Sequence, residues 1–167
     1  LARQAHGFGT IGCEAPRGLV RVKQVHGRTV LRATRASDAP LGEADAIVCD
    51  VPGLSIGVVT ADCIPVLIAT PSGAVAAVHA GWRGLAAGVL EASVDALGRI
   101  AHDAADAVAV IGPHIRARCY EVDAPVVSAL KGRFGDAVDA ALRATRPGHF
   151  EIELARLAAL DLSRAGF

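Results

Sequence analysis

The alternation and clustering of hydrophobic positions along the chain predict a series of short strands. Residues 18–34 alternate apolar and polar side chains, which predicts two short strands, or one bent strand, around His26 and Gly27. Apolar runs over residues 44–50, 54–60, 64–70, 74–80 and 107–112 predict further strands. Turn signals such as Val51-Pro52-Gly53 separate them.

Other segments have helical spacing. Residues 85–100 place Leu85, Val89, Leu90, Val94 and Leu97 on one face, and residues 124–134 and 151–165 also read as helices. Strands and helices are mixed without a regular strand–helix–strand rhythm. We therefore expect an α/β sandwich with mixed sheets flanked by helices, not a doubly wound parallel sheet. The linker over residues 143–150 is too short for a domain boundary, so residues 1–167 are expected to form a single domain.

Composition narrows the function classes. The 17 basic and 17 acidic residues give no net charge, which disfavours nucleic acid and anionic membranes as partners and favours small-molecule chemistry. The start of the chain lacks the apolar core of a signal peptide, and Asp62 and Pro65 interrupt the longest apolar stretch, so no membrane segment is expected. The four cysteines show no CxxC spacing and are expected to be reduced thiols in a cytoplasmic protein, with a disulfide as the alternative.

The segment HAGWRG crowds a histidine, the only tryptophan and an arginine between glycines. Gly81 and Gly84 would let a ligand approach the backbone around Trp82, and a helix start there would favour an anion. Arg83 adds a cationic fork suited to phosphate or carboxylate. The alternative is a glycine-rich turn with a solvated Arg83 and a tryptophan that covers the core.

Cys63 interrupts an apolar run beside Asp62, while His26 and His79 lie at the ends of predicted strands, close to glycines. One Cys with two His residues is a three-ligand set used for catalytic zinc, and it also suits copper. The same residues allow Cys63 to be a nucleophile, with His79 as its base and Asp62 orienting that base. A buried structural cysteine is the third interpretation.

Other polar candidates are weaker. His114 follows a predicted buried strand and is a candidate for substrate binding, and Tyr120 and Arg116 could line a pocket near it. His102 and His149 lie in polar connecting segments and are expected to be solvated.

The motifs QVHG, ADAIV, TADC, HAGWRG and IGPHIRARCYEV occur in the order found in one family. The chain resembles the laccase-domain family, also called multicopper polyphenol oxidoreductase-like or purine nucleoside phosphorylase-like proteins. The likeness is close over residues 20–125, with HGFGT before it and ELARLAALDLSRAGF after it. The resemblance implies an α/β sandwich similar to that of certain cysteine deamidase toxins.

The resemblance also implies a site and an activity. The family's metal ligands fall on His26, Cys63 and His79, where zinc is associated with the family and copper has been proposed. The implied reactions are phosphorolysis of adenosine, inosine, guanosine and methylthioadenosine, and deamination of adenosine. For these reactions the anion site expected at Arg83 and the surrounding turn would hold phosphate. The residues themselves do not identify a general acid, for which Asp62 and His114 are the candidates. Nucleoside and phosphate are therefore the expected partners.

The chain departs from the family pattern at both ends. The Arg-Gly-Gly and Ser-Leu-Asn-Leu-Gly segments expected after HGFGT do not occur in these 167 residues, nor do the final Cys-Thr and Tyr-Arg-Arg segments. Either the chain represents a short subfamily, or these segments lie outside the 167 residues. Because these parts help to build the nucleoside pocket, the substrate is less well defined than the metal site. A copper oxidoreductase acting on phenols, a Cys-His hydrolase or amidase acting on a peptidoglycan precursor, and a non-catalytic nucleotide-binding module remain alternatives.

Overall fold

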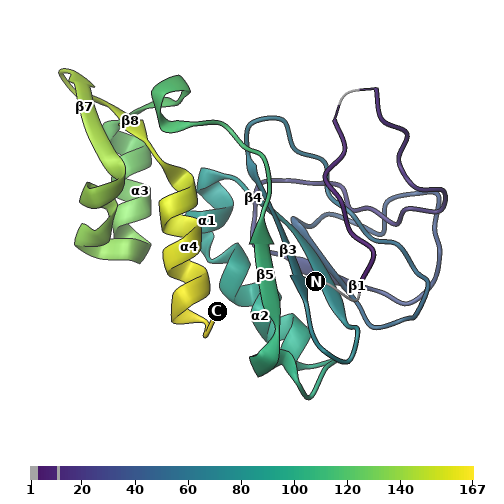
Figure 1. Ribbon diagram of the computed structural model, residues 1–167. Coiled ribbons are helices and arrows are strands. Elements are labelled where there is room, and N and C mark those ends of the chain that lie inside the picture. Colours follow the sequence, from purple (N-terminus) through teal and green to yellow (C-terminus); the bar gives the residue numbers. More distant parts are fainter. Residues whose placement is uncertain (1–3, 11) are drawn as a thin grey trace.

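The computed structural model describes residues 4–10 and 12–167, and its main feature is a mixed β-sheet with helices on one face and loops on the other (Figure 1). The strands of this sheet are β1 (Val30–Ala33), β2 (Ala46–Cys49), β3 (Ile64–Ala69), β4 (Val75–Ala80) and β5 (Val108–Ile111). Their order is β1-β2-β4-β3-β5, in which β1 and β2 are parallel and the other neighbours antiparallel. The expected mixed α/β architecture is thereby confirmed.

Helices pack on one face of this sheet, and a smaller sheet lies beyond them. The helices are α1 (Trp82–Ala87), α2 (Val89–Gly98), α3 (Ala124–Phe134) and α4 (Leu154–Arg164), with short 3-10 turns at Ala104–Asp106, Ala117–Cys119 and Gly135–Ala141. The smaller antiparallel sheet has the order β6-β8-β7, from β6 (Glu121–Asp123), β7 (Leu142–Arg146) and β8 (His149–Ile152). No helix in the described ranges has the length and apolar character needed to cross a lipid bilayer.

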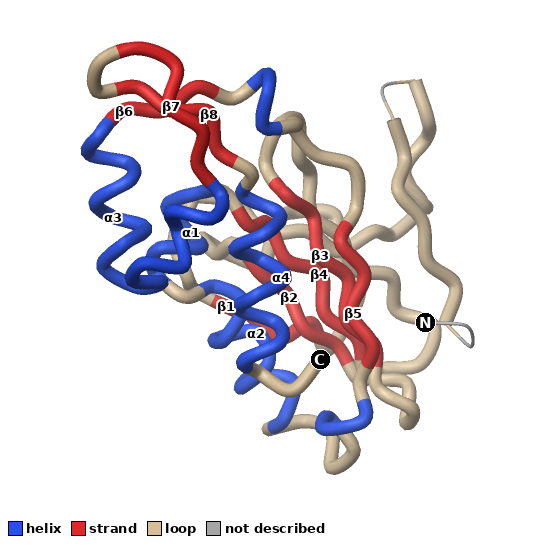
Figure 2. The backbone as a smooth tube through the Cα atoms, turned by 60° about the vertical axis from the view of Figure 1, so that its left-hand side comes forward, coloured by secondary structure: helices blue, strands red, loops and turns tan. Residues whose placement is uncertain are grey.

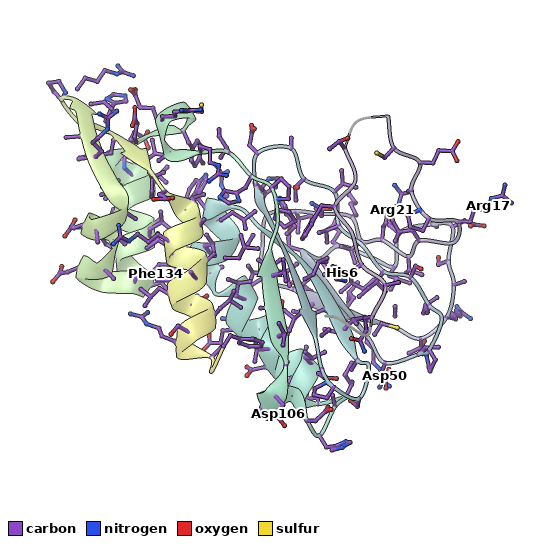
Figure 3. The ribbon with its side chains drawn as sticks, in the orientation of Figure 1. His6, Arg17, Arg21, Asp50, Asp106 and Phe134 are labelled. Atoms are coloured by element: carbon purple, nitrogen blue, oxygen red, sulfur yellow. The ribbon has the colours of Figure 1, made fainter. Side chains whose placement is uncertain are left out.

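The larger sheet is buried on both faces because successive side chains of its strands point to opposite sides. Ala76 and Val78 of β4 belong to the core shared with the helices, whereas Ala77 between them belongs to a second core beneath the loops. The loop layer supplies Val20 and Val22 to that second core. Figure 2 shows the loops in tan on the side of the strands away from α2 and α4, and Figure 3 shows Arg17 and Arg21 on this loop side. The loop layer therefore has its own hydrophobic attachment to the sheet.

The expected helix over residues 85–100 is interrupted. Gly88 adopts a left-handed conformation with φ 85° and serves both as the last cap of α1 and as the first cap of α2. A Cβ atom at this position would lie 2.6 Å from Nη1 of Arg133, so the guanidinium group lies directly over the glycine. The hydrophobic spacing continues through the break and therefore did not reveal it.

The structure also differs from the expected strands. In the segment over residues 18–34 only β1 is a regular strand, and Val20 instead forms an isolated bridge with Ile56 of the predicted 54–60 strand. The expected linker over residues 143–150 lies in the β7–β8 hairpin, and the last helix begins at Leu154 because residues 151 and 152 belong to β8. These segments have weak or mixed periodicity, so pairing with distant strands decides their conformation.

The HGFGT segment packs near one end of β5. The ring of Phe8 occupies the space that a side chain at Gly112 would fill. Gly112 directly follows β5, and its N–H donates to the carbonyl oxygen of Pro65 at 2.8 Å. The start of the described chain is thus seated against the strand that leads into the 112–120 loop.

Candidate metal centre

Three residues from distant parts of the chain converge. One potential ligand atom from each of His26, Cys63 and His79 lies within 4.8 Å of the others. The rings of His26 and His79 meet edge to face, with centroids 4.8 Å apart and an angle of 80° between the planes. The three residues that the family resemblance implies as ligands therefore lie together, as a His-Cys-His group that could hold a metal ion.

Strand pairing accounts for two of these positions. His79 lies near the end of β4 and is paired with Pro65 of β3, while Cys63 directly precedes β3. Because β3 and β4 are antiparallel neighbours, the end of β4 and the beginning of β3 lie side by side at the same end of the sheet. The thiol and the imidazole are thus brought together by the most central strands of the fold.

His26 reaches the cluster from the loop layer. Among the non-glycine residues that the structure describes, His26 alone has a left-handed backbone, with a φ of 59°. Such a conformation is disfavoured for a residue with a side chain and persists only where the surroundings hold it. Its side chain is exposed, whereas Cys63 is half-buried and His79 is buried, so the group opens toward solvent on the His26 side.

Asp45 holds this arrangement from beneath. Its Oδ1 lies 2.8 Å from Nδ1 of His79 and accepts from the backbone N–H of His26 at 2.8 Å. Its Oδ2 accepts from the N–H of Gly27 at 2.6 Å and from that of Val25 at 3.3 Å. Asp45 itself is fully buried. A single carboxylate therefore contacts both histidines of the cluster.

The surroundings shift the pKa values of this carboxyl group and of the neighbouring thiol. Burial by itself raises the pKa of Asp45, but the hydrogen bonds from His79 and from the backbone outweigh it and hold that pKa below its usual range. Burial raises the pKa of the Cys63 thiol, and the negative charges of Asp62 and Asp45 raise it further. Cys63 is thus not activated as a thiolate by its protein neighbours, whereas a coordinated metal ion deprotonates a thiol outright.

Gly81 leaves room for the cluster. A Cβ atom at this position would lie 2.9 Å from Sγ of Cys63 and 3.4 Å from Cδ2 of His26. The backbone of Gly81 is extended, with φ −76° and ψ 172°, which any residue can adopt. The glycine is therefore required for the space it leaves and not for its conformational freedom.

The rest of the HAGWRG turn lies beside the cluster. Arg83 is exposed, and its guanidinium carbon lies 4.3 Å from the centroid of the Trp82 ring, a stacked cation–π arrangement. A Cβ atom at Gly84 would lie 3.1 Å from the carbonyl oxygen of Gly27, so α1 packs closely on the loop that carries His26. The stacking holds Arg83 at the surface, on the turn that follows His79 and Gly81.

The 112–120 loop runs along the TADC segment. The N–H of Ile115 donates to the carbonyl oxygen of Asp62 at 3.0 Å, which continues the β3–β5 pairing beyond both strands. The side chain of Asp62 is exposed, and Nδ1 of His114 lies 2.7 Å from the carbonyl oxygen of Gly112. Tyr120 is half-buried, and its pKa is raised first by burial and then by Cys63, whereas Arg83 lowers it. Tyr120 thus lies within the electrostatic reach of the cluster.

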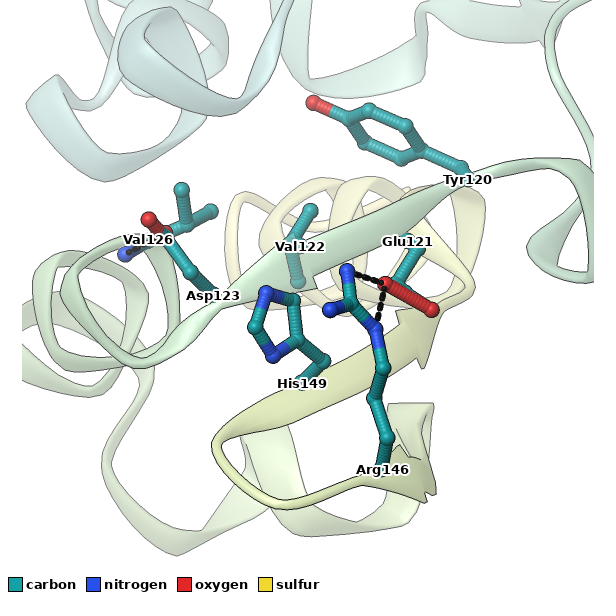
Figure 4. A pocket seen from close by; sticks show the side chains of 7 residues that line it. All are labelled: Tyr120, Glu121, Val122, Asp123, Val126, Arg146 and His149. Carbon is teal, nitrogen blue, oxygen red and sulfur yellow. Dashed lines mark hydrogen bonds and ion pairs between the residues drawn. The ribbon is translucent and has the colours of Figure 1, made fainter.

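A cavity of about 400 Å³ lies over the smaller sheet and is separate from the metal-binding residues. Glu121 and Arg146 form an ion pair of 2.6 Å there, and His149 lies beside them (Figure 4). The ring of Tyr120 turns away from this pair. The Glu121–Arg146 pair at the cavity is exposed and already satisfied, and none of His26, Cys63 and His79 lines it.

Asp45 is the residue at the candidate site that the sequence did not single out. It belongs to the ADAIV motif, but nothing distinguished it from other acidic residues. The available signal was a carboxylate directly before the uninterrupted apolar run of β2, since a charged residue in a buried segment normally has specific partners. Arg116, by contrast, is exposed.

Comparison with known proteins places this geometry in a family. A model of the family described as multi-copper polyphenol oxidoreductase laccase matches residues 3–167. A purine nucleoside phosphorylase of Pseudomonas aeruginosa is 42% identical over 144 residues, which are 86% of this chain and 57% of that protein. The purine nucleoside phosphorylase YfiH of Escherichia coli is 40% identical over 146 residues, which are 87% of this chain and 56% of that protein. The chain spans a little over half the length of these curated relatives.

Solved structures of similar sequence also share the fold of this chain. A Neisseria meningitidis protein superposes with a TM-score of 0.79 at 37% identity, covering 89% of this chain and 61% of that one. The YfiH protein of Bacillus licheniformis gives a TM-score of 0.83 at 32% identity, covering 89% and 60%. From the match over nearly its whole length, the chain belongs to the multi-copper polyphenol oxidoreductase laccase family.

Proposed function

We propose that this chain is the metal-binding part of a purine nucleoside phosphorylase. The observation that carries the proposal is the His26–Cys63–His79 group, found in a chain whose relatives are named purine nucleoside phosphorylases. The proposed substrates are adenosine, inosine, guanosine and methylthioadenosine together with phosphate. Deamination of adenosine is proposed as a second activity of the same site.

The donor set fits zinc. Two imidazoles and one thiolate are a three-ligand combination that leaves a further position for water or substrate, and the set also suits copper. The bare backbone of Gly81 beside Cys63 and the backing of His79 by Asp45 match what such a centre needs. When bound, the metal would supply a Lewis acid that polarises the substrate or activates water.

The surrounding residues have roles that follow from their places. Arg83, held on Trp82 at the surface, would bind phosphate and orient it toward the ribose, so that positioning and charge stabilisation contribute most of the catalysis. Gly81 and Gly84 keep the turn close to the cluster. Asp62 and His114, on paired segments at its rim, are the proposed proton donors or substrate contacts.

The alternatives fit the site less well. A Cys63 nucleophile would need a lowered thiol pKa and a base oriented by Asp62, but the pKa of Cys63 is raised and His79 is bonded to Asp45. A phenol-oxidising laccase has the support of the family's description, but the His-Cys-His group stands alone as a possible metal site in the described ranges, where oxygen reduction would need several clustered coppers.

Product identification tests the proposal. Zinc-loaded protein is incubated with adenosine, with and without phosphate, and the products are separated by chromatography. We expect phosphate-dependent adenine, with phosphate-independent inosine if the site also deaminates. Cys63→Ser should abolish both products, whereas Cys119→Ser, at an exposed cysteine, should leave them unchanged. If protein shown to hold its metal forms neither adenine nor inosine, the proposed function is wrong.

A further inference from the structure

We propose that Asp45 is a positioning residue that presets both histidines of the metal centre before any metal arrives. It would do so by fixing the proton of His79 on Nδ1, which leaves Nε2 free to face the cluster, and by holding the loop of His26 in its left-handed turn. This inference rests on the proposed metal site, but not on the identity of the substrate.

The hydrogen-bond donors around the buried carboxylate of Asp45 determine which nitrogen of His79 carries the proton. The backbone N–H groups of Val25, His26 and Gly27 donate hydrogen bonds to the carboxylate of Asp45. An ionised carboxylate only accepts hydrogen bonds, so the 2.8 Å contact with His79 requires Nδ1 to be the donor. In a neutral imidazole the other nitrogen, Nε2, then carries the free lone pair that a metal needs.

The same carboxylate holds the backbone around His26. Three successive N–H groups over residues 25–27 converge on the two oxygens of Asp45, and they do so because His26 has a φ of 59°. Without those bonds the left-handed turn would lose what offsets its cost. The backbone N–H of His79 also donates to the carbonyl oxygen of Asp45 at 2.8 Å, so the same residue holds His79 at two points.

An amide in place of the Asp45 carboxylate would change which nitrogen of His79 carries the proton. The Asp45→Asn substitution keeps the size of the side chain but leaves one oxygen and one NH2 group, so the amide cannot accept on both sides. If the amide oxygen keeps the N–H groups of Val25 and Gly27, the NH2 group faces Nδ1 of His79, which must then become the acceptor. The proton of His79 moves to Nε2, and the nitrogen that faces the cluster can no longer bind a metal.

The experiment measures tautomer and metal affinity separately. Long-range 15N–1H correlation spectra of metal-free protein report which ring nitrogen of His79 is protonated, and comparison with His79→Ala protein identifies the signals. We expect Nδ1–H in the wild type and Nε2–H in Asp45→Asn. Zinc affinity, from competition with a chromophoric chelator, should fall about 10- to 100-fold in Asp45→Asn.

Asp50→Asn is the matched control. Asp50 lies just after the other end of β2, and among residues 4–10 and 12–167 its carboxylate bonds only Arg32, at the surface. Its amide variant should therefore keep both the wild-type tautomer and the wild-type zinc affinity. If Asp45→Asn fails to fold, the tautomer of His79 in the wild-type spectrum tests the proposal by itself. Nε2–H in metal-free wild-type protein, or unchanged zinc affinity in a folded Asp45→Asn protein, would overturn the proposal. A protein with the expected tautomers that fails to phosphorolyse nucleosides would overturn only the proposed function.

Discussion

Gly81 shows how a single missing side chain shapes the metal centre. Its neighbours Cys63 and His26 come within van der Waals distance of the place where a Cβ would be, and its backbone would accept any residue. Replacement by alanine therefore tests space alone, with no backbone strain added.

For Gly81→Ala we expect zinc affinity to fall at least tenfold while the free energy of unfolding of the metal-free protein drops by about 1–3 kcal/mol, the usual cost of overpacking. Chelator competition and urea unfolding measure the two quantities. Gly98→Ala is the control, because a Cβ there meets nothing within 4 Å and alanine favours the helix. Unchanged zinc affinity in Gly81→Ala would show that the ligands can move aside.

Acid should act on the same centre through Asp45. Its pKa in the folded state lies below its usual range, so the carboxylate stabilises the fold at pH values above its unfolded pKa of about 4. That contribution is lost as the pH falls through the lower, folded pKa. We therefore expect the difference in free energy of unfolding between the wild type and Asp45→Asn to shrink steadily below about pH 4. Urea unfolding at a series of pH values measures it, and a difference independent of pH would contradict the expectation.

Among the elements, the junction of α1 and α2 depends on α3 and α4. Arg133 of α3 lies over Gly88 and bonds Asp161 of α4 at 2.8 Å, where the Asp161 side chain is only 3% exposed. Glu91 at the start of α2 completes the network at 3.3 Å. In the described parts of the chain, Nε of Arg133 and Oδ2 of Asp161 have no hydrogen-bond partner, so the pair is buried but incompletely satisfied.

Breaking this pair from one side should be costly. Arg133→Met leaves the buried charge of Asp161 uncompensated, and we expect the free energy of unfolding to fall by about 3–5 kcal/mol. The double variant Arg133→Met, Asp161→Leu removes both charges and should recover most of that loss. Urea unfolding of both variants measures the effect. A double variant no more stable than the single one would mean that the helices depend on the pair itself.

For the whole molecule, a metal ion at the candidate centre would add a link between the loop layer and the sheet beyond the hydrophobic core that they share. His26 belongs to the loop layer, while Cys63 and His79 belong to the end of the sheet that is backed by helices. A metal ion bound by all three would fasten one layer to the other.

Zinc should therefore slow hydrogen exchange unevenly. Amides of residues 24–29, around His26, should gain about tenfold or more in protection, corresponding to about 1.4 kcal/mol, beyond the gain in α3. Mass spectrometry of zinc-loaded and metal-free protein compares them, with His26→Ala as the variant that should lose the difference. Equal gains in both segments would show that zinc acts only on global unfolding.

The prediction from sequence succeeded where chemistry and periodicity were both local. The runs that became β2 to β5 and the helix over Ala124–Phe134 carry clear patterns, and the proposed metal ligands stand in motifs that resemble a known family. It failed where distant contacts decide: Gly88 breaks a continuous helical pattern beneath Arg133, and residues 143–150 pair into a hairpin. Asp45 was missed for the same reason, because its partners lie about 20 and 34 residues away along the chain.

The packing of the Phe8 ring against Gly112 has a consequence for evolution and protein engineering. The aromatic ring fills the space that a side chain at position 112 would need, so neither position can change freely while the other is kept. Relatives that carry a larger residue at the position of Gly112 should have lost the aromatic ring at the position of Phe8, and an alignment of the family would reveal the pair as covarying. An engineer who grafts the 112–120 loop into another member of the family should therefore transfer the HGFGT segment with it.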